Sequence, residues 1–172
     1  TRALSSAASD VYKRQIMNNK AVFAGTFDPF TLGHYEIAER ASKQFTTLYV
    51  AVADGNQTKS CRFNLKKRVK IAQLSLGALK NVIVVPFRGF LVDFMRENDI
   101  KVFVRGLRNT VDFEYERNLY NVYKSQDDSV EGCYFMASNG LAHVSASLVR
   151  EILDLNGDVT GYIREEAAEE IK

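Results

Sequence analysis

The sequence lacks the features that mark several common classes of protein. No apolar run approaches the length needed to cross a bilayer. Two histidines, and two cysteines that form no C-x-x-C pair, are too few for an obvious zinc site. We expect Cys61 and Cys133 to be free thiols in a reducing compartment, although the sequence alone leaves a disulfide between them open.

The chain also carries little excess charge of either sign. Its formal net charge is +2, and the first sixteen residues contribute +2 by themselves, through Arg2, Lys13 and Arg14 against Asp10. The rest of the chain is therefore neutral, whereas a nucleic-acid-binding domain usually has a basic excess. A general nucleic-acid-binding function is disfavoured, and the composition is that of an ordinary soluble globular protein.

Residues 1–16 differ from everything that follows them. They are small and polar, show no helical or strand periodicity, and lack the apolar segment of a secretory signal. A mitochondrial-type transit peptide is one interpretation, and a cloning or gene-model extension ahead of Met17 is the one we favour. We expect residues 1–16 to be disordered and residues 17–172 to form a single domain.

From Lys20 onward, short apolar runs alternate with longer amphipathic stretches. The runs predict strands near 21–24, 48–53, 82–85, 102–104 and 134–137. Helical spacing predicts helices near 37–45, 65–79, 90–95, 112–123, 148–156 and 165–171. This alternation predicts an α/β fold, a single doubly wound Rossmann-like domain with a five-stranded parallel sheet flanked by helices. Ligands of such folds bind at the carboxyl ends of the strands.

The loop after the first predicted strand is the first candidate site. It runs from Gly25 to His34 as G-T-F-D-P-F-T-L-G-H and leads into a helix. The amino end of a helix offers unpaired N–H groups to an anion, so Gly25, Gly33, Thr26 and His34 are suited to binding phosphate. A plain turn with Thr31 as the helix cap fits the residues equally well. No G-x-G-x-x-G is present, which disfavours an ordinary dinucleotide-binding dehydrogenase.

Two further clusters follow later strands. Arg105-Gly106-Leu107-Arg108, followed by D-F-E-Y-E from Asp112, suits an anionic ligand because arginine forks match phosphate oxygens. Ser145 and Ser147 lie at the predicted start of a helix, where they could cap it or hold a phosphate. A surface loop with ion pairs and an ordinary helix cap are the alternative interpretations of these two clusters.

Taken together, these segments resemble bacterial phosphopantetheine adenylyltransferases, in the nucleotidylyltransferase superfamily with a T/H-x-G-H motif. The resemblance rests on G-T-F-D-P-x-T-x-G-H, on R-G-L-R with D-F-E-Y-E, and on V-S-A-S-L-V-R, and spans about residues 19–164. The chain departs from the family pattern at Ala24, Lys66-Lys67, Leu141-Ala142-His143 and Ala146. The changes at 141–146 put the details of adenine binding in question.

The resemblance implies that residues 17–172 form a nucleotidylyltransferase domain that moves the adenylyl group of ATP directly to 4′-phosphopantetheine. It implies the catalytic residues His34, Thr26 and Arg108. It implies an ATP site made of Thr26, Phe27, His34, Gly106, Leu107, Arg108, Glu116, Leu141, Ala142, His143, Val144, Ser145, Ala146 and Ser147. It implies an acceptor site made of Thr26, Lys59, Leu91 and Arg105.

The resemblance further implies Mg²⁺ on the triphosphate with no dedicated protein metal site, a homohexamer, possible feedback by coenzyme A, and a cytoplasmic location. No nucleic-acid or membrane partner is expected. Two alternatives stay open on the sequence. One is an adenylyltransferase for another acceptor, such as nicotinate mononucleotide, and the other is an inactive nucleotide-binding module.

Overall fold

The computed structural model describes residues 19–55 and 60–171. Its strands are β1 (Lys20–Gly25), β2 (Thr47–Ala53), β3 (Val82–Phe87), β4 (Val102–Leu107) and β5 (Glu131–Met136). Its helices are α2 (Leu32–Ser42), α3 (Leu65–Leu76), α4 (Leu91–Glu97), α5 (Thr110–Gln126), α6 (Ala146–Asp154) and α7 (Ala168–Ile171), with 3₁₀ turns η1 (Thr160–Tyr162) and η2 (Glu165–Ala167).

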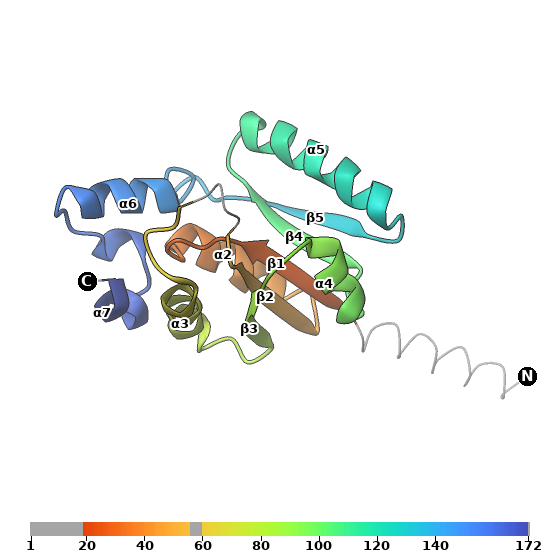
Figure 1. The fold of residues 1–172 in the computed structure, drawn as a ribbon. Helices are drawn as coiled ribbons and strands as arrows, with labels where there is room; N and C mark the ends of the chain where they lie inside the picture. Colours follow the sequence, from red (N-terminus) through yellow and green to blue (C-terminus); the bar gives the residue numbers. More distant parts are fainter. Residues whose placement is uncertain (1–18, 56–59, 172) are drawn as a thin grey trace, which may run out of the picture.

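The five strands form one parallel sheet in the order β3-β2-β1-β4-β5 (Figure 1). The chain adds β2 and then β3 on one side of β1, and then β4 and β5 on the other side. The strand order therefore contains a switch point between β1 and β4. Ligands of open α/β sheets bind in the crevice outside the carboxyl ends of the strands at such a point. The predicted doubly wound, five-stranded parallel sheet is confirmed.

Both faces of the sheet are buried, and β1 shows why the fold needs helices on each side. Ala21 and Phe23 pack in one hydrophobic cluster, with residues of α2, α3, α6 and α7. Val22 and Ala24 pack in the other cluster, with residues of α4 and α5. The side chains of a strand alternate between the two faces, so the unbroken apolar run of β1 fills both cores.

Several predicted boundaries shift in the structure. Strand β4 continues to Leu107, because Arg105 pairs with Tyr134 and Leu107 with Met136 of β5. The two residues Arg105 and Gly106 therefore lie within a strand and not in the loop after it. Strand β5 starts at Glu131, earlier than predicted, since its polar and small first residues hide it from an apolar pattern. Helix α2 ends at Ser42, before the predicted Phe45, although Phe45 is buried.

The amino ends of three helices gather at the carboxyl edge of the sheet, because α2 follows β1, α5 follows β4 and α6 follows β5. Thr31 caps α2, Asn109 caps α5 and Ser145 caps α6, each through a side chain that accepts a backbone N–H. Each end carries positive partial charge, so the fold directs three helix dipoles toward one region. No helix in the described ranges has the length and apolar character required to span a bilayer.

Candidate active site

A cavity of about 650 Å³ opens at the carboxyl ends of β1 and β4. The starts of α2, α5 and α6 bound it, and residues after β2 close one side. Its lining includes Phe23, Ala24, Gly25, Thr26, Phe27, Asp28, Gly33, His34, Ile37, Ser60, Cys61, Arg105, Gly106, Arg108, Asp112, Tyr115, Glu116, Ala137, Leu141, Val144, Ser145, Ala146, Ser147 and Arg150. All three sequence clusters therefore meet in one cavity.

His34 stands in the first turn of α2, where its ring and Thr31 cap each other. The Nδ1 atom of His34 accepts the backbone N–H of Thr31 at 3.0 Å, and the backbone N–H of His34 is 3.4 Å from the Thr31 hydroxyl. Because Nδ1 is an acceptor here, the neutral ring carries its proton on Nε2. The ring thus keeps one N–H donor for the cavity that it lines.

The environment of His34 favours its neutral form. The ring packs edge-on against Phe27 with centroids 5.0 Å apart, and also contacts Phe30 and Phe23. Burial and, second, the positive charge of Arg108 lower the pKa of His34 to about 4. At neutral pH the site therefore offers a neutral imidazole donor and not an imidazolium.

The two glycines of the first loop, Gly25 and Gly33, allow close packing within the protein. A Cβ on Gly33 would lie 3.3 Å from the Val144 carbonyl oxygen, so Gly33 lets the segment before α6 approach the start of α2. A Cβ on Gly25 would lie 3.0 Å from the Phe27 ring. Both glycines therefore have a structural role in addition to the predicted approach of a phosphate.

Arg105 is held firmly by protein groups. Its Nη1 donates to the Ala24 carbonyl at 2.6 Å and its Nη2 to the Tyr123 hydroxyl at 3.3 Å, while Nε lies 3.2 Å from Glu116 Oε2. The Nε atom of Arg105 and Oε2 of Glu116 are buried, and neither has a hydrogen-bond partner within residues 19–55 and 60–171. Burial chiefly raises the pKa of Glu116, against the lowering effect of Arg105. These two atoms face each other as a buried ion pair, which helps to hold the guanidinium of Arg105 in place on the cavity wall.

Arg108 is placed differently, at the mouth of the cavity. Its Nε and Nη2 donate to the two carboxylate oxygens of Asp112 at 2.9 and 3.1 Å, and its backbone N–H donates to the same carboxylate. The hydrogen bonds to Asp112 raise the pKa of Arg108. The side chain of Arg108 is 39% exposed, so a stronger anion can compete with Asp112 for it at little desolvation cost.

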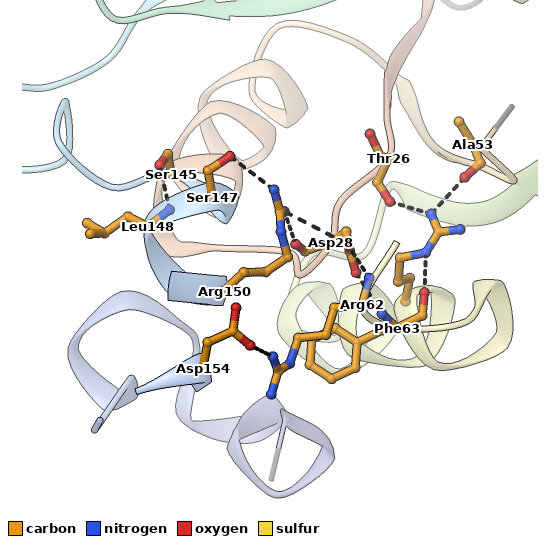
Figure 2. Close-up of polar contacts among 11 residues, drawn as sticks. Thr26, Asp28, Ala53, Arg62, Phe63, Ser145, Ser147, Leu148, Arg150 and Asp154 are labelled. Atoms are coloured by element: carbon orange, nitrogen blue, oxygen red, sulfur yellow. Dashed lines mark hydrogen bonds and ion pairs between the residues drawn. The ribbon is translucent and has the colours of Figure 1, made fainter. Parts of the chain in front are cut away.

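The start of α6 forms the opposite wall (Figure 2). Ser145 accepts the backbone N–H of Leu148 at 3.1 Å, and Ser147 accepts from Arg150 Nη2 at 3.0 Å. Arg150 Nη1 donates to the Asp28 carbonyl oxygen at 2.6 Å, which ties α6 to the first loop. The ion pair between Arg62 and Asp154 joins α6 to a different segment, the connection between β2 and α3 (Figure 2).

Some predicted residues lie elsewhere. The described cavity lining does not include Leu91, Leu107, Ala142 or His143. Leu91 is 5% exposed and packs in the cluster of α4, and Leu107 is 6% exposed. The ring of His143 is exposed and lies 6.3 Å from that of Tyr162. Lys59 falls outside the described residues.

The cavity also contains residues that were not among the predicted site. Asp28 belongs to the G-T-F-D-P string, and Asp112 and Tyr115 belong to D-F-E-Y-E, so the motifs themselves carried a signal for these three. Ser60 and Cys61 come from the connection after β2, where no pattern marked them. Cys61 and Cys133 form no disulfide in the part of the chain that the structure describes.

Comparison with known proteins agrees with this geometry. The model of the cytidylyltransferase-like family matches residues 22–152. Among solved structures, a provisionally named nicotinate-nucleotide adenylyltransferase from Vibrio parahaemolyticus superposes with a TM-score of 0.69, covering 90% of this chain and 92% of that one. At 17% identity, that similarity establishes the fold alone.

Curated relatives narrow the family. A phosphopantetheine adenylyltransferase from Nautilia profundicola is 42% identical over 155 residues, which is 90% of this chain and 100% of that protein. A phosphopantetheine adenylyltransferase from Burkholderia mallei is 44% identical over 143 residues, which is 83% of this chain and 86% of that protein. The chain therefore belongs to the cytidylyltransferase-like family and, within it, to the phosphopantetheine adenylyltransferases.

Proposed function

We propose that this protein is an enzyme of coenzyme A biosynthesis that transfers the adenylyl group of ATP to 4′-phosphopantetheine. An oxygen of the acceptor phosphate attacks the α-phosphorus of ATP in line. The bond from the α-phosphorus to the bridging oxygen breaks, and dephospho-coenzyme A and pyrophosphate form. The observation that carries the proposal is the meeting of His34, Arg105, Arg108 and the start of α6 in one cavity.

The chain's own residues act by positioning the reactants and stabilising charge, which is where catalysis of phosphoryl transfer mainly lies. His34 donates from Nε2 to an oxygen of the α-phosphate, beside Thr26. Arg108 exchanges Asp112 for the β- and γ-phosphates, which also meet the helix end at Ser145 to Ser147. Arg105, which is held by Glu116, binds the acceptor phosphate, and the family resemblance assigns Lys59 to the same phosphate.

The substitutions near α6 bear on whether the chain is active. Two of the four unusual residues at 141–146, Ala142 and His143, are not part of the described cavity lining. Leu141 and Ala146 do line it, and Ser145 keeps its capping role. An inactive nucleotide-binding module is therefore the weaker alternative, because the changes spare His34, Arg108, Ser145 and Ser147, whose side chains we propose to hold the triphosphate.

Mg²⁺ is the cofactor that we propose, carried on the triphosphate. No group of three or more His, Cys, Asp or Glu side chains within the described ranges is arranged to hold a metal ion. Mg²⁺ commonly binds through nucleotide phosphates and water with few protein ligands, so the cavity is compatible with an ion that enters with ATP. Bound there, the ion would neutralise charge on the pyrophosphate leaving group.

A hexamer is the assembly that we propose, and an apolar face supports self-association. Helix α5 and the edge strand β5 expose large apolar side chains, namely Val111, Phe113, Tyr115, Val122, Tyr134 and Met136. Exposed apolar side chains beside an open sheet edge are typical of a surface that another chain covers. The number six comes from the family resemblance. Light scattering of wild-type protein and of Phe113→Arg would test it, with a hexamer expected for the former and smaller species for the latter.

We also propose that coenzyme A competes for this cavity and that the enzyme works in the cytoplasm. Coenzyme A contains the adenylyl and phosphopantetheine groups in the linkage that the proposed reaction forms. It should therefore fit the same cavity. The two cysteines, which form no disulfide within the described residues, are consistent with a reducing compartment. Displacement of a fluorescent ATP analogue by coenzyme A would support shared binding, and independent binding would contradict it.

The reaction itself can be followed by label. ATP labelled at the α-phosphorus should pass its label to a phosphopantetheine product, and label at the γ-phosphorus should leave as pyrophosphate. Label from the γ-phosphorus on the acceptor would mean a kinase reaction and would refute adenylyl transfer. His34→Ala protein serves as the control for contaminating activity.

A further inference from the structure

Two charged side chains are buried in the part of the chain that the structure describes, and both hold the same stretch of backbone. Asp28 is 4% exposed and Arg68, on the first turn of α3, is 1% exposed. Both contact Phe63, which follows the cavity-lining residues Ser60 and Cys61. Both buried charges therefore lie next to the cavity wall, where they can affect the site.

The guanidinium of Arg68 joins three separate segments through backbone carbonyls. Its Nε donates to the Phe63 carbonyl oxygen at 2.9 Å. Its Nη1 donates to the carbonyl oxygens of Thr26 at 2.5 Å and Ala53 at 2.7 Å. The carbonyl groups of Thr26, Ala53 and Phe63 all face one guanidinium in Figure 2. Arg68 thus connects the first loop, the end of β2 and the last residues of the connection that leads into α3.

Asp28 holds the same connection from the other side. Its carboxylate oxygens accept the backbone N–H groups of Arg62 at 2.8 Å and Phe63 at 3.0 Å (Figure 2). The N–H of Phe63 is therefore fixed by Asp28, and its carbonyl by Arg68. The segment that contributes Ser60 and Cys61 to the cavity wall is therefore anchored at Phe63 by two buried charged side chains.

This arrangement is costly if stability is its only purpose. Removing a guanidinium from water carries a large desolvation penalty, and the guanidinium of Arg68 donates to three neutral carbonyl groups. A well-packed apolar side chain often stabilises a core position better than a buried charge does. What the fork of Arg68 supplies, and an apolar residue cannot, is a fixed distance between three chain segments.

We propose that Arg68 is a positioning residue for the adenylyl transfer, a role that rests on the proposed function. It fixes the cavity wall at Ser60–Phe63 against the loop that carries Thr26, and so sets the separation of acceptor and nucleotide. Arg68 itself is not among the residues that line the described cavity. Its effect reaches the substrates through Thr26 and through the wall.

Steady-state kinetics of Arg68→Lys and Arg68→Met test the proposal. Lysine keeps the charge, but its single nitrogen cannot stand at the positions of both Nε and Nη1, and methionine keeps only the apolar stem. In both variants we expect kcat/KM for phosphopantetheine to fall by roughly tenfold to a hundredfold, because small misplacements of reactants have effects of this size. The KM for ATP should stay near wild type, since Arg108 and α6 are untouched.

Ile71→Ala provides the matched control for stability. Ile71 is fully buried on the same helix and is not part of the described cavity lining. It should lower the denaturation midpoint in urea while each folded molecule keeps wild-type kinetics. This separates a positioning effect from simple destabilisation of α3.

The outcomes are distinct. Wild-type kcat and KM per folded molecule in Arg68→Lys or Arg68→Met would overturn the proposal. Failure of both variants to fold would overturn it too, because Arg68 would then be required for folding and not for positioning. Wild-type protein without acceptor-dependent turnover would contradict the proposed function, and this inference would fall with it.

Discussion

Replacement of His34 separates its two roles, as a helix cap and as a donor to the transferred group. His34→Asn puts an amide oxygen close to the position of Nδ1, where it can still accept the Thr31 N–H, but leaves no donor at the position of Nε2. His34→Ala removes both. The pair of variants therefore distinguishes loss of catalysis from loss of the cap.

The magnitudes follow from the contacts. Loss of one well-aimed donor to a transition state lowers kcat by about 10²–10³-fold, or roughly 3–4 kcal/mol. We expect this loss in both variants, with little change in the KM for ATP, because Arg108 and the start of α6 still hold the triphosphate. Loss of a capping interaction costs about 0.5–2 kcal/mol of unfolding free energy, and only His34→Ala should show it in full.

Pyrophosphate release at saturating substrates gives kcat, and urea denaturation gives the free energy of unfolding of the same samples. Wild-type turnover in His34→Asn would refute the assigned role of Nε2. A fall in turnover that follows only the unfolded fraction of His34→Ala would refute it as well.

Three further predictions follow from the same site. The pKa of His34 is lowered to about 4, so its ring should be unprotonated at about pH 5. NMR titration of His143→Gln protein, in which His34 is the single histidine, measures this pKa. A titration midpoint near the ordinary value of 6.5 would contradict the structure. Because the unfolded chain binds this proton at higher pH than the folded chain, the free energy of unfolding should fall as pH drops from 6.5 toward 4 in wild type and much less in His34→Ala. Ala146→Ser adds the hydroxyl of the family pattern to the cavity wall and should lower the KM for ATP by about twofold to tenfold, the effect of one neutral hydrogen bond. An unchanged KM for ATP would mean that residue 146 does not contact the nucleotide.

The sheet and its order of elements could be predicted because each strand from β1 to β4 contains an apolar run that both cores require. The start of β5 could not, since Glu131 and Gly132 look like a turn and become a strand only by pairing with Val102 and Phe103. The limits of β4 were missed for a similar reason. Pairing between strands depends on residues far apart in sequence, which a local pattern does not contain.

The candidate site also has a part that could be predicted from the sequence and a part that could not. The meeting of His34, Arg105 and Ser145 could be predicted, because each follows or ends a parallel strand. The bonds of Arg68 to three carbonyls could not, since an arginine in an amphipathic helix is ordinarily expected at the surface and its partners are 5, 15 and 42 residues away. Leu91 packs in the buried cluster of α4, so its role at the acceptor site, which came from the family resemblance, stays a prediction.

The most direct test of the proposed function is pyrophosphate release from ATP and Mg²⁺ with phosphopantetheine, and in parallel with nicotinate mononucleotide, by protein shown to be folded. Release that depends on phosphopantetheine, and not on nicotinate mononucleotide, is the predicted result. Silence with phosphopantetheine, or a preference for nicotinate mononucleotide, would contradict the assignment of the acceptor.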